Sequence, residues 1–156
     1  MSEKTKNVLK IAGYSLILIF ISFFGSMDSK EYYLSLNLPK GAPPPLVFPI
    51  VWSVLYALMI VATCLIEVKV KDSLSKKDAI SYYFTQLMVN ALWPYLFFMF
   101  KVPLLAFVWL VLLLVLVILT FIKFYNLYKL SGYMLIPYIL WIIYAGYINL
   151  FVVILN

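Results

Sequence analysis

Five apolar stretches limit what this chain can fold into more than any other feature of its sequence. They cover approximately residues 8–25, 46–66, 79–100, 103–125 and 133–155. Each is close to the ~20 residues that a helix needs to cross the hydrocarbon core of a bilayer. The hydrophobic content of 66% and the mean hydropathy of +1.05 also lie far outside the averages of soluble proteins. The sequence therefore predicts an all-α membrane protein, a bundle of five transmembrane helices that forms one domain over residues 1–156.

The first apolar stretch follows several lysines and so shares one property with a secretory signal peptide. No small-x-small cleavage pattern comes after it, however, and four further apolar stretches follow. We therefore expect it to be retained as the first helix of the bundle. With five spans, the two termini would face opposite sides of the membrane.

The distribution of the lysines predicts how the bundle is oriented. One end would carry nine of the twelve lysines: Lys4, Lys6, Lys10, Lys69, Lys71, Lys76, Lys77, Lys123 and Lys129. The other end would carry Lys30, Lys40 and Lys101. The positive-inside rule then places the N-terminus in the cytoplasm and the C-terminus outside, in what we expect to be a bacterial cytoplasmic membrane. We assign the lysines to orientation and to contact with anionic lipid headgroups, and expect no nucleic-acid partner.

The chain lacks the residues of most conventional active sites. Histidine is absent and Cys64 is the only cysteine. The six carboxylates lie near the N-terminus or between the apolar stretches: Glu3, Asp28, Glu31, Glu67, Asp72 and Asp78. This composition excludes internal disulfides, cysteine–histidine zinc sites and axial histidine ligation of haem. We expect no metal site, and we find no group inside the membrane for acid–base catalysis.

The longest connection between the apolar stretches is predicted to be a functional lid. It covers residues 26–45, and connections of this length are usually functional when they lie within a compact domain. The prolines at 43–45 restrict the backbone, and Gly41 just before them permits a sharp reversal. We therefore expect a stiff loop that leads directly into the next helix, with Pro49 in the first turn of that helix.

Three of the apolar stretches each carry aromatic and polar residues at helical spacing. The first such stripe holds Phe48, Trp52, Tyr56 and Met59, the second Gln86, Asn90, Trp93 and Phe97, and the third Pro137 or Tyr138, Trp141, Ala145 and Asn149. Amides are costly in lipid, so these must point into the bundle. Two interpretations stay open for them. They join helices by hydrogen bonds, or they line a pocket for a flat, largely apolar ligand together with the aromatic rings.

The same residues form ordered motifs that identify a family. The motifs are Tyr33-x-x-Leu36-x-x-Pro39 with Pro43-Pro44, then Phe48-x-x-Val51-Trp52-x-x-Leu55-Tyr56, then Gln86-Leu87-x-x-Asn90-x-x-Trp93 with Phe97-Phe98, and finally Pro137-Tyr138-x-x-Trp141-x-x-x-Ala145 with Asn149. In these motifs, and over nearly its whole length, the chain resembles the TspO/MBR family. These are the tryptophan-rich sensory proteins related to the mitochondrial translocator protein, or peripheral benzodiazepine receptor.

The resemblance implies a fold, a site and ligands. It implies a homodimeric five-helix bundle whose pocket, beneath the first loop, binds porphyrins, haem, sterols and synthetic benzodiazepine-site drugs, with no cofactor required. Carried over by position, it places nine residues around the ligand: Tyr33, Pro43, Pro44, Phe48, Trp52, Asn90, Trp93, Trp141 and Ala145. The chain departs from the family pattern at Gly41 and Ala42, where a tryptophan often precedes the proline pair, so its lid is less rich in tryptophan.

The function expected from this resemblance is the sensing or regulation of tetrapyrrole levels by binding within the bundle. One alternative is an enzyme, because Trp52 and Trp141 match tryptophans that are implicated, in some bacterial relatives, in light-dependent oxidative degradation of protoporphyrin IX. A second alternative is passive transport of porphyrin or lipid-like molecules. Membrane lipid and a hydrophobic small molecule are the expected partners in every case.

Overall fold

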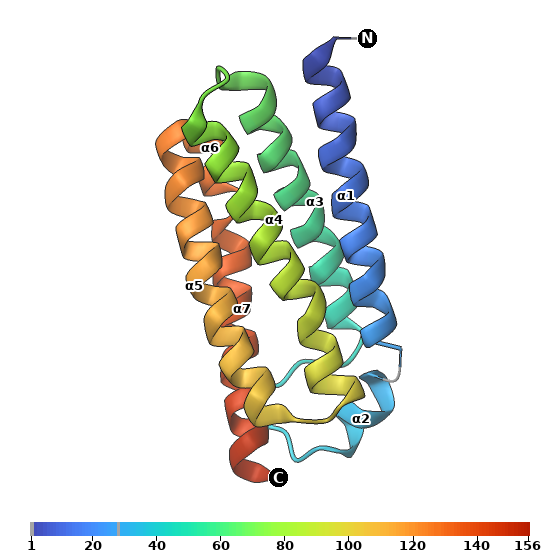
Figure 1. Cartoon of the computed structure of the whole chain (residues 1–156). Coiled ribbons are helices and arrows are strands. Elements are labelled where there is room, and N and C mark those ends of the chain that lie inside the picture. Colours follow the sequence, from blue (N-terminus) through green and yellow to red (C-terminus); the bar gives the residue numbers. More distant parts are fainter. Residues whose placement is uncertain (1, 28) are drawn as a thin grey trace.

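The computed structural model describes residues 2–27 and 29–156, and within these ranges the chain forms helices and no β-strand. In chain order the elements are α1 (Glu3–Gly25), α2 (Ser29–Ser35), α3 (Val47–Lys69), α4 (Leu74–Pro94), the π-helix η1 (Tyr95–Met99), α5 (Pro103–Leu127), α6 (Lys129–Tyr133) and α7 (Ile136–Leu155). Figure 1 shows the long helices side by side in an elongated bundle, with the two termini at opposite ends.

Four segments of the described chain are long and apolar enough to cross a membrane: α1, α3, α5 and the stretch Lys129–Leu155. Helix α4, which contains most of the third predicted span, is not among them. Its first turns carry Lys76, Lys77 and Asp78, and two amides follow further along it, so its mean hydropathy is lower. Length and composition therefore support four of the five predicted spans.

Local sequence signals explain where several helices begin. Ser2 and Ser73 cap α1 and α4, because each side-chain oxygen accepts a hydrogen bond from a backbone N–H three residues later. Helix α5 begins at Pro103, which has no N–H that would need a partner in the first turn. Helix α3 begins at Val47, so that Pro49 lies in its first turn, as the sequence predicted.

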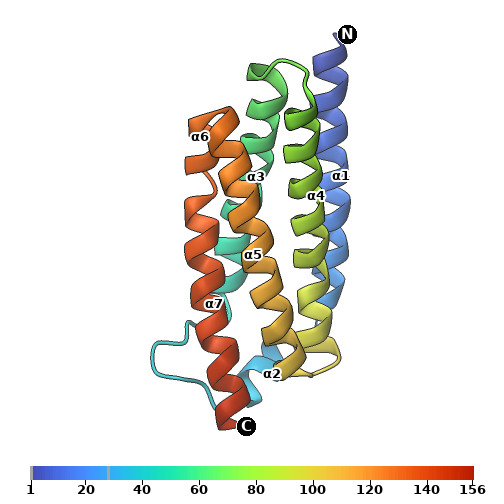
Figure 2. The same ribbon diagram turned by 60° about the vertical axis from the view of Figure 1, so that its left-hand side comes forward.

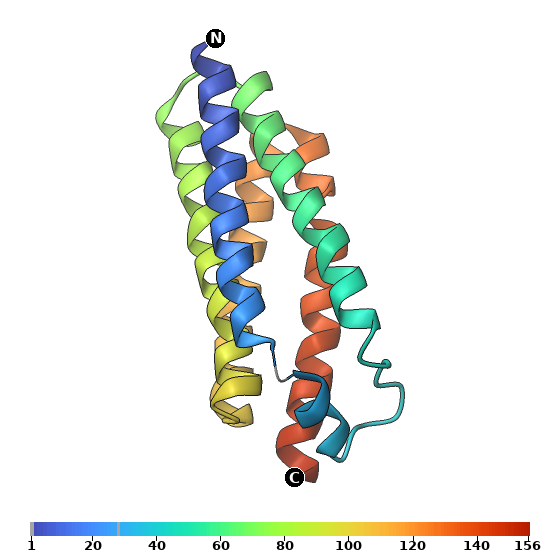
Figure 3. The same cartoon turned by 90° about the vertical axis from the view of Figure 1, so that its right-hand side faces the viewer.

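The helices pack as two connected groups. Helix α5 packs against α4 and α7, while α1 packs against α3 and α4. Figure 2 shows α6 and the connection between α3 and α4 at the end of the bundle where the N-terminus lies. Figure 3 shows α2 and the loop of residues 36–46 at the opposite end, close to the end of α7. The connection predicted to be a lid is therefore partly helical, and the name lid is kept for this loop. The two predicted groups of lysines consequently lie at opposite ends of the bundle.

One carboxylate lies elsewhere than the sequence predicted. Glu67 is not in a loop but in the last turns of α3, where it is 4% exposed. Its Oε2 lies 2.8 Å from Lys76 Nζ, and its Oε1 accepts a hydrogen bond from Asn7 Nδ2 at 2.9 Å. Lys76 also pairs with the exposed Asp72, and the hydrogen bond and charge of this lysine lower the pKa of the Asp72 carboxyl. Burial of Glu67 is tolerated because its charge is paired and hydrogen-bonded.

Gly132 in α6 packs closely against α5. A Cβ added at this position would lie 2.7 Å from Cα of Tyr125 and 2.9 Å from its backbone nitrogen. Backbone atoms of a helix cannot rotate away, and overpacking of this kind costs about 1–3 kcal/mol. We therefore expect Gly132→Ala to lower the melting temperature of the purified protein in detergent. Gly13→Ala is the matched control, because a Cβ at Gly13 meets nothing within 4 Å, and equal effects of the two substitutions would contradict this packing.

Candidate ligand-binding site

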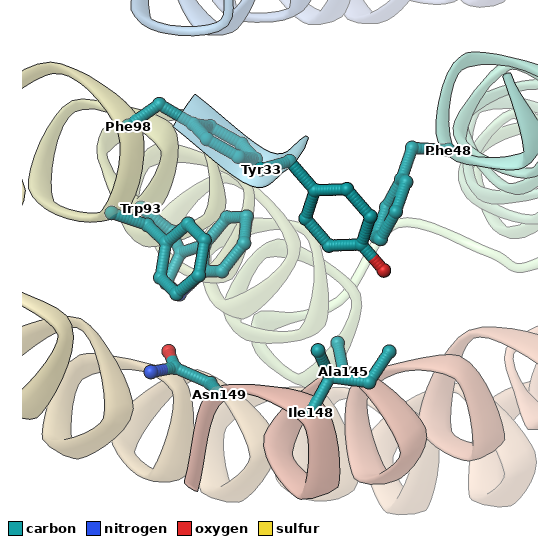
Figure 4. A pocket seen from close by; sticks show the side chains of 8 residues that line it. Tyr33, Phe48, Trp93, Phe98, Ala145, Ile148 and Asn149 are labelled. Atoms are coloured by element: carbon teal, nitrogen blue, oxygen red, sulfur yellow. The ribbon is translucent and has the colours of Figure 1, made fainter. Parts of the chain in front are cut away.

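A small aromatic cavity lies beneath α2, where α3, α4, η1 and α7 come together. Eight residues line it: Tyr33, Phe48, Trp93, Phe97, Phe98, Ala145, Ile148 and Asn149. Figure 4 shows Trp93, Phe98 and Asn149 on one side of this cavity, Phe48 on the other and Tyr33 across its middle. The cavity volume is about 10 Å³, which is room for about one water molecule.

The end of α4 supplies one wall of the cavity through stacked aromatic rings. Trp93 and Phe97 lie with ring centroids 5.0 Å apart and an interplanar angle of 16°. Phe98 meets Phe97 edge to face at 4.9 Å. Pro94 cannot donate the backbone hydrogen bond of a regular helix, and the chain continues directly after it as the π-helix η1. This irregular turn carries both phenylalanines into the wall, and such π turns are frequent at functional sites.

Tyr33 on α2 closes the cavity from the lid side. It is 3% exposed, meets the Phe48 ring edge to face at 5.1 Å, and donates a hydrogen bond from its hydroxyl to the carbonyl oxygen of Pro43 at 2.9 Å. Burial, followed by the influence of Tyr144, raises the pKa of Tyr33 to about 12. The hydroxyl therefore stays protonated at neutral pH and remains a donor that ties α2 to the proline run.

The lid is also tied to α7. Tyr144 donates to the carbonyl oxygen of Gly41 at 2.6 Å, and Tyr147 donates to that of Lys40 at 3.1 Å. At the far end of α7, Asn156 accepts from the backbone nitrogen of Asn37 at 2.9 Å and donates back to its carbonyl at 3.2 Å. The contacts of both tyrosines lie at the surface of the bundle, and a single hydrogen bond contributes only about 0.5–1.5 kcal/mol net.

A second, fully hydrogen-bonded layer lies next to the cavity inside the bundle. Asn90 Nδ2 donates to the Tyr138 hydroxyl at 2.6 Å, and Tyr138 donates to Gln86 Oε1 at 2.9 Å. Tyr56 donates to Asn90 Oδ1 at 2.8 Å, and Gln86 Nε2 lies 3.6 Å from the sulfur of Met59. For Gln86 and Asn90, the structure thus supports the interpretation that the amides join helices, here α3, α4 and α7.

Three buried polar atoms in the described part of the chain lie near the cavity and have no hydrogen-bond partner. They are Trp93 Nε1, Trp141 Nε1 and Asn149 Oδ1. The first and third belong to residues that line the cavity, and Trp141 packs against the lining residue Phe48 with ring centroids 5.9 Å apart. Because nearly all buried polar groups in folded proteins are hydrogen-bonded, these atoms mark the cavity as a place where a polar group of a ligand could be received.

Of the nine residues predicted to surround a ligand, four line the cavity, two belong to the hydrogen-bonded layer and three lie outside both. The residues that line the cavity are Tyr33, Phe48, Trp93 and Ala145. Trp141 does not line the cavity but meets the ring of Phe48 edge to face. Trp52 and Asn90 belong to the hydrogen-bonded layer, where Trp52 stacks on Tyr56 at 5.4 Å. Pro43 contributes its carbonyl to Tyr33, whereas the exposed Pro44 does not line the cavity.

Sequence reasoning did not assign four of the cavity-lining residues to the site: Phe97, Phe98, Ile148 and Asn149. Phe97 and Asn149 were on the predicted aromatic–polar stripes, so a signal existed for them. Phe98 belonged with Phe97 to one of the family motifs, but helical spacing gave no signal for it because its position depends on the π-helix. Ile148 had no signal, because it is an ordinary apolar residue of α7. Tyr138 is the centre of the hydrogen-bonded layer. On the third predicted stripe it was one of two alternatives for the first residue, the other being Pro137.

The cavity as it stands is far smaller than a site for a large ligand. Pockets that enclose small organic ligands usually have volumes of about 300–1,000 Å³, so side chains now fill most of the space that a tetrapyrrole needs. The chemistry of the walls nevertheless suits a flat apolar molecule with a few polar atoms. A ligand of that size would enter only if the lid, the aromatic stack or both moved.

The fold and the cavity define a class of protein, namely a helical membrane bundle with an aromatic cavity beneath a connecting loop. The model of the TspO/MBR family matches residues 11–155, and the chain belongs to this family. It is an integral membrane protein and a relative of the tryptophan-rich sensory proteins.

Three relatives illustrate the similarity. The tryptophan-rich protein TspO of Chlorobaculum tepidum is 31% identical, over 97% of this chain and 98% of that protein. The protein CrtK of Rhodobacter capsulatus is 33% identical over 76% of this chain and 74% of its own length. The tryptophan-rich sensory protein of Cereibacter sphaeroides is 29% identical over 87% of this chain and 88% of that protein.

The hydrogen-bonded layer leads to a prediction about stability. Tyr138→Phe removes the hydroxyl that pairs with both Asn90 and Gln86, and a buried group that loses its partner costs about 1–3 kcal/mol. We expect a clear fall in melting temperature in detergent. Tyr14→Phe is the control, because Tyr14 is 57% exposed on α1 and should tolerate the change. Similar melting temperatures for the two variants would show that the layer contributes nothing.

Proposed function

We propose that the protein binds a tetrapyrrole of the porphyrin or haem type, or a similarly flat hydrophobic molecule, in the cavity beneath the lid, and acts as a sensor or regulator of its level. The observation that carries this proposal is the set of stacked aromatic rings together with three buried polar atoms that have no partner. Membership of the TspO/MBR family supports it. The ligand would stack against the rings and satisfy the polar atoms.

We also propose that α4 crosses the membrane as a fifth span, with the N-terminus in the cytoplasm. Helix α4 packs against α1 and α5, and three of its polar residues, Lys76, Gln86 and Asn90, are 2%, 1% and 3% exposed, whereas the exposed charges Lys77 and Asp78 lie in its first turns. Polar residues that face the interior of a bundle are compatible with a membrane span. The orientation is supported by the nine lysines at the N-terminal end of the bundle. Homodimer formation stays a prediction.

Binding in the cavity is tested by titrating purified protein with protoporphyrin IX and following the quenching of tryptophan fluorescence. We expect saturable quenching by the native protein. Ala145→Leu should weaken binding at least tenfold, because the larger side chain fills a cavity whose wall Ala145 forms. Ala57→Leu, on the exposed side of α3, is the matched control and should bind normally. Loss of affinity in both variants, or in neither, would contradict a site at this cavity.

Illumination of the complex with protoporphyrin IX distinguishes simple binding from light-dependent degradation. Under illumination, a sensor leaves the absorption of bound protoporphyrin unchanged relative to free porphyrin, whereas a photo-oxidative enzyme accelerates its loss. If loss is accelerated, Trp141→Phe should slow it, because Trp141 packs against a residue that lines the cavity. Trp52→Phe should have less effect, because Trp52 lies in the hydrogen-bonded layer.

The attachment of the lid to α7 predicts an effect on binding rates. Tyr144 and Tyr147 hold the lid through hydrogen bonds to carbonyl oxygens at 2.6 and 3.1 Å. Replacing both by phenylalanine keeps the rings and removes the hydroxyls. We expect faster association and faster release of protoporphyrin in stopped-flow fluorescence, with a smaller change in the equilibrium constant. Rates equal to those of the native protein would mean that the lid does not control entry.

A further inference from the structure

A donor and an acceptor that face the same cavity are both buried and both unpaired. Trp93 and Asn149 are 7% and 1% exposed, and neither Trp93 Nε1 nor Asn149 Oδ1 has a hydrogen-bond partner in the described chain. Figure 4 shows the two side chains on the same side of the cavity. They come from helices α4 and α7, so their meeting is a property of the tertiary structure.

The orientation of the Asn149 amide is determined by its other end. Asn149 Nδ2 donates a hydrogen bond to the carbonyl oxygen of Pro103 at 2.8 Å. A flipped amide would place two acceptors against each other at this position, which is unfavourable, so the hydrogen-bond network assigns the nitrogen to Pro103. The oxygen is therefore the atom that remains for another partner.

The surroundings restrict the chemistry of that partner. Apart from Asn149 and Tyr33, the residues that line the cavity are apolar or aromatic, and none is charged. A carboxylate could accept a hydrogen bond from Trp93. Its negative charge would, however, be repelled by the partial negative charge on the amide oxygen of Asn149, and it would lose its hydration without a counter-ion. A neutral hydroxyl can accept from the indole and donate to the amide oxygen, so it satisfies both atoms at once.

We propose that Trp93 Nε1 and Asn149 Oδ1 form a neutral hydrogen-bonding subsite that receives a hydroxyl group of the bound molecule, while the flat body of that molecule packs against the aromatic rings. This inference rests on the proposed ligand-binding function and, within it, favours flat molecules that carry a hydroxyl group; the propionates of a porphyrin would have to stay outside this subsite. A single water molecule has the same hydrogen-bonding chemistry, and a cavity of about 10 Å³ has room for one. The experiment has to distinguish a hydroxyl group of a ligand from a bound water molecule.

Three fluorescent probes with the same flat ring system test the subsite: pyrenemethanol, methylpyrene and pyrenecarboxylate. Binding to the full chain in lipid nanodiscs is followed by pyrene fluorescence anisotropy and corrected with nanodiscs that lack protein. We expect pyrenemethanol to bind about tenfold more tightly than methylpyrene, as two hydrogen bonds of ordinary net strength would give. Pyrenecarboxylate should bind most weakly of the three.

Trp93→Phe assigns the preference to the subsite. It keeps an aromatic ring next to Phe97 but removes the unpaired N–H together with one ring of the indole, so the melting temperature should fall somewhat, and the preference for pyrenemethanol should drop to about threefold or less. Trp109→Phe is the matched control, because Trp109 Nε1 donates to the carbonyl oxygen of Val89 at 2.8 Å away from the cavity. This control should lose stability and keep the preference.

Each result of the probe-binding experiment either supports or overturns the proposed subsite. Equal affinity for pyrenemethanol and methylpyrene in the native protein would overturn the subsite and would mean that water alone satisfies the two atoms. A preference that survives in Trp93→Phe would overturn it as well. In both cases saturable binding of methylpyrene would leave the proposed ligand-binding function intact. Failure of all three probes to bind would overturn the subsite, and the titration with protoporphyrin IX would decide the proposed function separately.

Discussion

The two hydrogen bonds that Asn90 makes, from the Tyr56 hydroxyl and to the Tyr138 hydroxyl, join α4 to both α3 and α7. In lipid there is no water to satisfy a side-chain amide, so an amide inside a bundle must find its partners on neighbouring helices. Apolar contacts alone define the relative position of two helices less sharply than hydrogen bonds do, because a hydrogen bond requires a particular donor and acceptor at a short distance. The pairing of Asn90 with two tyrosines defines one position of α3 and α7 relative to α4.

The cavity depends on this arrangement, because α4 continues directly from the hydrogen-bonded layer into the cavity wall. Asn90 is fully paired, while Trp93, one helical turn further on, carries a buried N–H without a partner. One layer thus stabilises the bundle and the next retains an unsatisfied capacity for hydrogen bonding. The lid lies over the cavity and is held there largely by exposed hydrogen bonds, which open more readily than the buried ones.

Much of this site could be predicted from residue spacing. Phe48, Trp93 and Ala145 were placed on inward faces by helical periodicity, and the structure brings all three to one cavity. Phe98 could not be found in this way, because its position depends on the π-helix after Pro94, and periodicity assumes a regular α-helix. Glu67 was assigned to a loop because it directly follows the second apolar stretch, yet Lys76 and Asn7 pair with it across the bundle. Such pairing is invisible to any pattern of neighbouring residues.

The sequence by itself determined the helical membrane class, the family, the separation of the lysines to two ends and the inward faces of the helices. These properties follow from composition and from periodicity within single helices, both of which are local. Only the tertiary structure decided that Gln86 and Asn90 join helices, whereas the oxygen of Asn149 is left facing the cavity. The reason is physical: an amide is paired or unpaired according to what other helices place opposite it, and that depends on packing between segments far apart in the chain.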